Sequence, residues 1–225
     1  DEDPLRPIKY IVETRSADAV IFNMTEPADE RVAYLLKKQF PFVTHGRTKW
    51  ADQHAYYDYD NTAFISVALH RLAKRGRKNI LAILPPRNQN YSQDMVRGLK
   101  QKGALLAIQY RISENVDSDQ PSEAILHWVT RRLEQSPEID AVLCTSSKAA
   151  ISAIVAIEKH GRKLGQDIDV YSKEVIPILK MFRENIIVEI EDVGLAGRFL
   201  AKAAIQHLQA QSLPLMQQLE VPTDT

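Results

Sequence analysis

The sequence has little cysteine, no excess charge of either sign and no long apolar run. Its single cysteine, Cys144, excludes a disulfide framework within these 225 residues and favours a reducing compartment, so we expect a cytoplasmic protein. Lysine and arginine together number 29, as do aspartate and glutamate, which gives a formal net charge of zero. Nucleic-acid-binding modules are usually basic, so this chain is not expected to bind DNA by itself. No apolar run reaches the ~18 residues that a membrane-spanning helix needs, so we expect no membrane partner.

The common signatures of catalysis and cofactor binding are also missing. The sequence contains no G-x-x-x-x-G-K-[ST], G-x-G-x-x-G, G-x-S-x-G or H-E-x-x-H motif. The six histidines show no spacing typical of metal ligands. Cys144 ends an apolar run that starts at Ile139, and we interpret it as a buried core thiol rather than a nucleophile. We therefore expect no enzyme activity, no metal and no cofactor.

The composition is that of an ordinary globular protein, with 44% hydrophobic and 26% charged residues. Short apolar runs alternate with segments of helical period. Strands are expected at residues 19–22, 42–44, 55–60, 79–84, 105–112, 139–144, 168–171, 186–190 and 213–221. Helices are expected at residues 5–15, 30–39, 61–76 and 91–101, after Pro121, at 148–160, and after Asp192. This alternation predicts an α/β doubly wound architecture with parallel sheets.

The stretch from Ala17 to Arg47 shows the pattern most clearly, because it reads as strand, loop, helix and strand. Parallel strands joined through a helix end at the same edge of a sheet, and ligands of open α/β sheets bind at that edge. Polar residues that follow the apolar strands are therefore the candidate ligand-binding residues, together with one aromatic residue that could stack on a sugar ring. They are Asn23, His45, Arg47, Trp50, Gln89, Tyr91, Ser146, Ser147, Lys173 and Glu174.

Each of these residues also has a purely structural interpretation. The alternatives are a helix cap for Ser146 and Ser147, a salt bridge for Arg47, core packing for Trp50, an ordinary structural histidine for His45, and a solvated ion pair for Lys173 and Glu174. The convergence of polar residues on one end of several apolar strands favours a pocket, because ligand pockets are built in that way.

Two polar interruptions suggest two lobes. Asp58–Asn61 and Glu189–Asp192 leave no room for a full extra element, and neighbouring helices pair naturally with strands on either side of them. We interpret both interruptions as crossovers between two similar sheets.

The order of several motifs resembles the effector-binding core of the lactose/galactose repressor (LacI/GalR) family of bacterial transcription regulators. The first part of the match is ADAVIFN at 17–23, PFVTHGR at 41–47, the helix start Asp60-Asn61, and Gly76–Ile80, which is similar to the family's G-H-x-x-I. The second part is Tyr91–Leu99, similar to R-x-x-G-F, then AVLCTSSKAAISAIVAIEKHG, similar to A-x-x-A-x-N-D-x-x-A-x-G, and finally EDVGLAGRFLAKAAIQHL, similar to the last family helix. The resemblance spans nearly all of the stretch from Ala17 to Leu208.

This resemblance implies two Rossmann-like lobes of the periplasmic-binding-protein type, joined by crossovers, with a small carbohydrate or carbohydrate derivative in the cleft. The first lobe would comprise residues 1–60 and 192–213, and the second 61–191 and 214–225. A homodimer is implied, as is operator DNA bound through an N-terminal helix-turn-helix headpiece. The start DEDPLRPIKY looks like mid-protein sequence, so we expect that the headpiece and the first βα unit of the first lobe precede it.

The family pattern also suggests roles for single residues. Asn23 falls where some sugar-binding members place a cleft asparagine, Arg47 at a strand end that often holds Asp or Asn-Arg, and Glu174 where an aspartate commonly binds sugar hydroxyls. Three positions depart from the pattern. The family arginine is Met95, the family Asn-Asp pair is Ser146-Ser147, and the Gly-aromatic pair is Ser172-Lys173. Unless Arg87 or Arg97 substitutes for the missing arginine, these departures argue against a simple hexose, and Lys173 could meet a carboxylate or a phosphate.

Two functions of different classes follow from this pattern. The first is a ligand-responsive transcription regulator, whose operator binding changes when the effector binds. The alternative is a periplasmic solute-binding protein of a sugar transporter, which shares the fold class. The sequence upstream of this chain distinguishes them, since the first needs a helix-turn-helix and the second a signal peptide.

Overall fold

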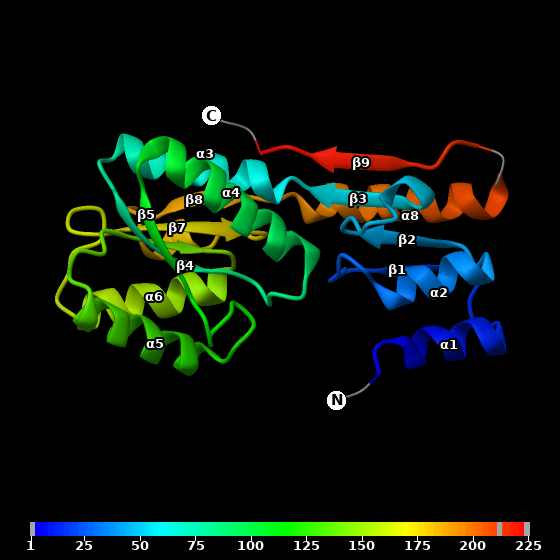
Figure 1. The fold of residues 1–225 in the computed structure, drawn as a ribbon, viewed down its shortest axis with the longest axis horizontal. Helices are drawn as coiled ribbons and strands as arrows, with labels where there is room; N and C mark the ends of the chain where they lie inside the picture. The colour runs from blue at the N-terminus through cyan, green and yellow to red at the C-terminus, as the bar shows by residue number, and fades with distance from the viewer. Residues whose placement is uncertain (1–2, 211–212, 223–225) are drawn as a thin grey trace. The chain divides into compact units, whose positions relative to one another are not determined.

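The computed structural model describes residues 3–210 and 213–222. The chain divides into two compact units. The first unit contains residues up to Tyr59, residues 88–91, and residues from Asp192 to Glu220; the second contains residues 60–87, 92–191 and 221–222. Each unit is built around its own parallel sheet (Figure 1), which confirms the predicted α/β class. The chain passes from one unit to the other after Tyr59 and after Glu191, within the two polar interruptions that the sequence marked.

The sheet of the first unit has the strand order β1-β2-β3-β9, with every neighbouring pair parallel. The strands are β1 (Val20–Phe22), β2 (Phe42–His45), β3 (Ala55–Tyr59) and β9 (Gln217–Glu220). The helices are α1 (Leu5–Thr14), α2 (Glu30–Lys38) and α8 (Val193–Gln209), with a short 3-10 helix η1 at Ala51–Gln53. Small residues on α8 such as Ala196 and Ala203 pack against Val43 and Tyr57 of the sheet. A separate apolar cluster joins α1 and α2 to the sheet at Phe42.

The sheet of the second unit has the order β5-β4-β6-β7-β8 and is also parallel throughout. Its strands are β4 (Asn79–Ile83), β5 (Gln109–Ile112), β6 (Ala141–Cys144), β7 (Asp169–Glu174) and β8 (Ile187–Ile190). Its helices are α3 (Asn61–Lys74), α4 (Asn90–Leu106), α5 (Ser122–Gln135), α6 (Ser147–Lys159) and α7 (Leu179–Phe182). Helices α5 and α6 lie side by side (Figure 1) and bury the central apolar strands. Cys144 is fully buried in that core, as the sequence predicted.

Helix α4 is longer than predicted, which makes the prediction of a strand from residue 105 wrong. The helix continues to Leu106, and β5 begins only at Gln109. Gly103 does not end the helix. Its missing side chain instead leaves room for the ring of Tyr110, whose carbons would lie 3.1 Å from a Cβ atom at that position. The chain leaves the helix at Ala107, which has a φ of 52°. A left-handed alanine gives no sequence signal, because glycine usually occupies that position.

Three other local predictions were wrong. Asp60 rather than Asn61 caps α3, since its carboxylate accepts a hydrogen bond from the Ala63 amide at 2.9 Å. Strand β7 continues through Glu174 instead of ending at Tyr171. Residues 214–225 were assigned to the second lobe, but those up to Glu220 belong to the first unit, where β9 pairs with β3. No element was predicted for the segment that forms α7.

No helix among the described residues is both long enough and apolar enough to cross a membrane.

Two helical glycines provide a matched pair for a stability prediction. A Cβ atom on Gly98 would lie 2.9 Å from the Ile65 Cβ and 3.0 Å from the Thr62 carbonyl oxygen, because α4 and α3 approach closely there. Nothing lies within 4 Å of a Cβ atom on Gly197 in α8. We expect Gly98→Ala to destabilise the protein by about 1–3 kcal/mol through overpacking. Gly197→Ala should stabilise it by roughly 0.5–1 kcal/mol through helix propensity. Urea denaturation of both variants tests this, and a stabilised Gly98→Ala would contradict the close packing.

Candidate functional site

In the first unit, the residues that follow β1 form a loop held together by a single arginine. The Asn23 side chain is exposed, and the backbone carbonyl oxygen of Asn23 accepts a hydrogen bond from the Arg31 guanidinium at 3.2 Å. Arg31 also donates to the Met24 carbonyl and to both carboxylate oxygens of the buried Asp29. This network fixes the loop while leaving the Asn23 amide at the surface.

Arg47 follows β2 and forms an ion pair, which was one of the two interpretations of this residue. Its Nε atom lies 2.6 Å from the Asp58 carboxylate, and its backbone amide donates to the same oxygen at 3.3 Å. Burial raises the pKa of Asp58, and the hydrogen bond and charge of Arg47 only partly oppose that effect. His45 is half-buried, with its ring 5.9 Å from that of Tyr57.

Trp50, Gln89 and Tyr91 complete the predicted residues of the first unit. Trp50 is partly buried and packs against the cluster of α1 and α2, and the Lys49 ammonium lies 4.3 Å from the centre of its ring. Gln89 is buried, and its side-chain oxygen has no hydrogen-bond partner among the described residues. The adjacent Asn90 amide donates to the Thr25 carbonyl at 2.8 Å, which ties the segment containing Gln89 and Tyr91 to the loop after β1.

In the second unit, the two neighbouring serines have different roles. The Ser146 side chain accepts a hydrogen bond from the Ala149 amide at 3.2 Å and caps α6, as the structural alternative predicted. The Ser147 hydroxyl instead donates to the Glu174 carboxylate at 3.1 Å. The structure therefore brings Ser147 and Glu174 together at the carboxyl ends of β6 and β7.

Glu174 is a buried acid, and the described residues give a hydrogen-bond donor to only one of its two carboxylate oxygens. Its exposed fraction is 1%. Oxygen Oε1 accepts hydrogen bonds from the Ser147 hydroxyl and from the Leu179 amide at 3.3 Å. Oxygen Oε2 has no hydrogen-bond partner within the described part of the chain. A buried carboxylate oxygen without a donor is costly, and Oε2 keeps the capacity to accept a hydrogen bond.

Lys173 points to different partners from its neighbour Glu174. Its ammonium lies 2.5 Å from the Glu191 carboxylate and donates to the Asn61 side-chain oxygen at 3.2 Å. It also lies 5.6 Å from the centre of the Phe64 ring. Lys173 thus links β7 to Asn61 at the start of α3 and to Glu191, the residue after β8. The Glu191 carboxylate balances the positive charge of Lys173.

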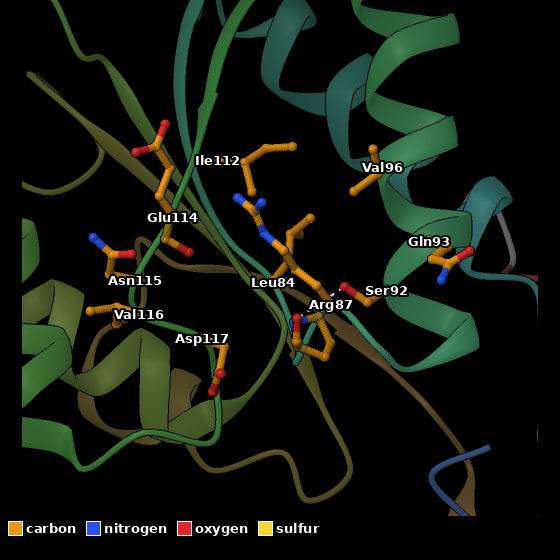
Figure 2. Close-up of a pocket in the computed structure, with 12 residues that line it drawn as sticks. Leu84, Arg87, Ser92, Gln93, Val96, Ile112, Glu114, Asn115, Val116 and Asp117 are labelled. Carbon is orange, nitrogen blue, oxygen red and sulfur yellow. Dashed lines mark hydrogen bonds between the residues drawn. The ribbon is translucent and has the colours of Figure 1, made fainter. Parts of the chain in front are cut away.

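The sequence did not predict a pocket of about 600 Å³ at the carboxyl ends of β4 and β5. We call it the β4–β5 pocket. Figure 2 shows Gln93 and Val96 of α4 on one wall, and the residues that follow β5 on the other. In this view Arg87 is drawn between the two walls. The complete lining is Leu84, Pro85, Arg87, Ser92, Gln93, Val96, Ile112, Ser113, Glu114, Asn115, Val116 and Asp117.

Two hydrogen bonds hold the β4–β5 pocket in shape. The Ser92 hydroxyl donates to the Pro85 carbonyl at 2.9 Å and fixes the start of α4 against the loop after β4 (Figure 2). The Ser118 amide donates to the Leu84 carbonyl at 2.9 Å and fixes the loop after β5. Among the residues that line this pocket, the sequence singled out only Arg87 as a possible ligand contact, because the walls come from a loop and a helix face whose polar residues look like ordinary surface.

The described residues include no group of three histidine, cysteine, aspartate or glutamate side chains that could hold a metal ion. Burial raises the pKa of the Cys144 thiol, which keeps it protonated and unreactive at neutral pH.

The curated proteins that are similar in sequence include two that align over most of this chain. The HTH-type transcriptional regulator AglR of Rhizobium meliloti (strain 1021) is 28% identical over 187 residues, which cover 80% of this chain and 51% of that protein. The HTH-type transcriptional regulator CelR of Thermobifida fusca is 24% identical over 180 residues, covering 76% and 51%. The chain therefore spans about half the length of these curated relatives.

Solved structures share the fold. A regulatory protein of the LacI family from Chloroflexus aggregans is 20% identical, with a TM-score of 0.83 over 98% of this chain and 79% of that one. A complex of the transcriptional regulator CelR with cellobiose is 18% identical, with a TM-score of 0.84 over 97% and 67%. The model of the family described as periplasmic binding proteins and sugar binding domain of the LacI family matches residues 4–215. The chain belongs to that family.

Proposed function

We propose that this chain is the effector-binding part of a LacI-family transcription regulator, and that its effector is a carbohydrate. The family match supports this, and the two curated relatives are both HTH-type transcriptional regulators, which favours regulation over solute transport. The whole protein would act in the cytoplasm and bind operator DNA through a headpiece outside this chain. The effector would change operator affinity by binding one conformation of the regulator more tightly than the other. No catalytic step is part of this proposal.

The observation that carries the proposal is the half-satisfied carboxylate of Glu174. Its free oxygen Oε2 is a hydrogen-bond acceptor at the carboxyl edge of a parallel sheet, where α/β proteins bind ligands. A sugar hydroxyl is a suitable donor, and a hydrogen bond to a charged group is worth more than a neutral one. Ser147 and the Leu179 amide hold the other oxygen, so the carboxylate is oriented before the ligand arrives.

The surroundings of Glu174 favour a neutral ligand. Lys173 was the candidate partner for a carboxylate or a phosphate, but its ammonium pairs with Glu191 within the second unit. An anion beside Glu174 would therefore meet a buried negative charge that this lysine does not offset. We propose a neutral sugar instead, and we retain the other predicted contacts as proposals: Asn23, His45, Arg47, Trp50, Gln89, Tyr91 and Ser146.

We further propose that the regulator is a homodimer that uses an apolar surface around α6 and α7. Met181 and Phe182 of α7 are 81% and 68% exposed. Val175 and Ile176, which precede α7 in the chain, and Ile151 on α6 are also exposed. The neighbouring charges Glu158, Lys180, Arg183 and Glu184 include both signs, which suits contact with a second copy. Sedimentation of a Met181→Glu, Phe182→Glu variant should show a monomer, whereas Leu105→Glu, an equally exposed control on α4, should leave the dimer intact.

A thermal-shift screen against mono- and disaccharides, sugar acids and sugar phosphates tests the proposed ligand class. Binding to the folded state raises the melting temperature by mass action. We expect neutral sugars to raise it and the phosphorylated forms to have a smaller effect. A panel in which only anionic compounds raise the melting temperature would contradict the proposal.

A further inference from the structure

We propose that Lys173 is a positioning residue, which couples an effector bound at Glu174 to two points where the chain passes from one unit to the other. These points lie after Tyr59 and after Glu191, and we call the residues around them the crossover segments. The inference rests on the proposed function, because it needs an effector at Glu174. It goes beyond that function by giving Lys173 a role in the response to the effector rather than in binding it.

Lys173 holds the second-unit end of both crossover segments at once. Its ammonium lies 2.5 Å from the carboxylate of Glu191, which is the last residue of the second unit before the chain passes to the first. The same ammonium donates a hydrogen bond at 3.2 Å to the side-chain oxygen of Asn61, the first residue of α3. One cation therefore joins two segments that are distant in sequence. We call Lys173, Glu191 and Asn61 the lysine clamp.

The main chain connects the lysine clamp to the proposed effector residue. Lys173 and Glu174 are neighbours on β7, and the Glu191 amide donates to the Glu174 carbonyl at 2.9 Å. Glu191 is thus bonded to the backbone of Glu174 and to the side chain of Lys173. A displacement of Glu174 by a ligand must either carry Glu191 with it or break this hydrogen bond, so the end of β7 and the second crossover segment are coupled.

The Lys173 side chain lies on the opposite face of the sheet from Glu174. Successive side chains of a strand point to opposite faces. The Lys173 ammonium lies 5.6 Å from the centre of the Phe64 ring on α3, whereas the Glu174 carboxylate accepts a hydrogen bond from Ser147 at the start of α6. Lys173 is therefore placed to act on the crossover segments without contacting a ligand bound at Glu174.

The lysine clamp contains a buried ion pair, which permits only a narrow range of geometries. The side chains of Lys173 and Glu191 are 11% and 10% exposed. Each buried charge carries a large desolvation penalty, so the pair is favourable only while the two groups stay in close contact. An apolar contact is non-directional and would tolerate sliding. The clamp therefore fixes the positions of both crossover segments relative to β7, as a residue that transmits a small displacement needs to do.

Removing the ion pair should separate sugar binding from the operator response. The variant Lys173→Met, Glu191→Gln removes both charges and leaves neither buried alone. It would be tested in the complete protein, with an operator selected from random DNA and with glucose, galactose, cellobiose, maltose and melibiose as probes. Calorimetry measures sugar affinity, and fluorescence anisotropy measures operator affinity. We expect sugar affinity within about three-fold of wild type, while the sugar-induced change in operator affinity falls from roughly 5- to 150-fold to less than about two-fold.

The ion pair between Arg71 and Glu189 provides the matched control. It also joins α3 to β8, with 2.9 Å between the charged groups, and its side chains are 19% and 8% exposed. Arg71 lies in the last turn of α3, at the opposite end of the helix from Asn61. The variant Arg71→Met, Glu189→Gln should lower the melting temperature as much as the clamp variant does, but it should keep the wild-type operator response.

Hydrogen exchange in the wild-type chain, measured by NMR with the same five sugars, tests the coupling without any variant. The Glu191 amide donates to Glu174, and the Ala63 and Phe64 amides donate to Asp60 at the start of α3. We expect a bound sugar to change exchange at these three amides and to leave the last turn of α3 unchanged.

The outcomes separate this inference from the proposed function. The coupling role is wrong if the clamp variant keeps the wild-type response, if it loses sugar binding, or if the Arg71 control loses the response equally. Unchanged exchange at Glu191 while a sugar binds would also contradict it. In each of these cases carbohydrate control of the wild type stands. If none of the five sugars binds the wild type, or none changes its operator affinity, the proposed function fails, and the coupling role fails with it.

Discussion

Replacing Asp169 with alanine is expected to lower the free energy of unfolding by about 3–5 kcal/mol, the usual cost of removing one partner from a buried ion pair. Asp169 is fully buried at the start of β7. Its carboxylate accepts hydrogen bonds from the Nε atoms of Arg75 at 2.9 Å and Arg77 at 2.6 Å. Arg77 is itself largely buried, with 14% of its side chain exposed, so losing Asp169 would leave a desolvated positive charge without its partner.

Urea denaturation at neutral pH measures this loss, and a surface ion pair provides the control. Arg183 pairs with Glu158 at 2.7 Å, and both side chains are substantially exposed. Exposed pairs contribute little because water screens them, so Glu158→Ala should leave stability almost unchanged. Equal losses in the two variants would contradict the assignment of Asp169 as a buried anchor of the second unit.

The stability that Asp169 supplies should depend on pH with a definite sign. Burial alone would raise the pKa of Asp169, but hydrogen bonds from Arg75 and Arg77 outweigh it and hold the pKa below its usual range. A carboxylate with a lowered folded-state pKa stabilises the fold above its unfolded pKa, and the stabilisation disappears as the pH falls through the folded pKa. The gap between wild type and Asp169→Ala should therefore be full at pH 7 and narrow below about pH 4.

The second large effect is expected on ligand affinity, in the Glu174→Gln variant. The amide oxygen of glutamine can still accept from Ser147 and Leu179, so the fold should be retained. The amide nitrogen would replace oxygen Oε2, which has no partner among the described residues. An amide nitrogen only donates, so it cannot accept a hydrogen bond from a sugar hydroxyl. Losing a hydrogen bond to a charged acceptor costs ~1.5–3 kcal/mol, so sugar binding should weaken roughly 10- to 150-fold.

Calorimetry with whichever sugar gives the largest thermal shift measures the effect of Glu174→Gln. Ser147→Ala should weaken binding less, because it removes only a group that orients the carboxylate. Glu158→Gln changes an exposed glutamate in the same way and should bind the sugar like wild type. An unchanged affinity in Glu174→Gln, with an unchanged melting temperature, would remove this residue from the site.

Elements with uninterrupted patterns could be predicted from the sequence, whereas elements with polar strand ends or unmarked helix ends could not. Buried parallel strands such as β4 and β6 read as continuous apolar runs, and the bounds of both were predicted to within two residues. Strand β7 carries the polar residues Ser172, Lys173 and Glu174 in its second half, so a loop was predicted there instead of a strand. The end of α4 depends on a left-handed alanine, a conformation that no residue type there indicates.

Only part of the candidate site could be predicted from the sequence, for a related reason. Position along the chain indicated Glu174, but only the fold shows that Ser147 reaches it while Ser146 caps a helix. The same holds for Lys173, whose partners Asn61 and Glu191 are distant in sequence. The β4–β5 pocket depends on surface residues from three segments, and their juxtaposition is a property of the topology rather than of any motif.

Operator binding by the complete protein, with and without sugar, tests the account most directly. The operator would be selected from random DNA, and the sugar would be the one with the largest thermal shift. Fluorescence anisotropy then gives the operator affinity at several sugar concentrations. The account predicts a change of roughly 5- to 150-fold, the usual range of allosteric coupling, and a much smaller change at the same sugar concentration in Glu174→Gln. Operator affinity that stays constant while the sugar demonstrably binds would contradict the proposal that this chain senses a carbohydrate to control transcription.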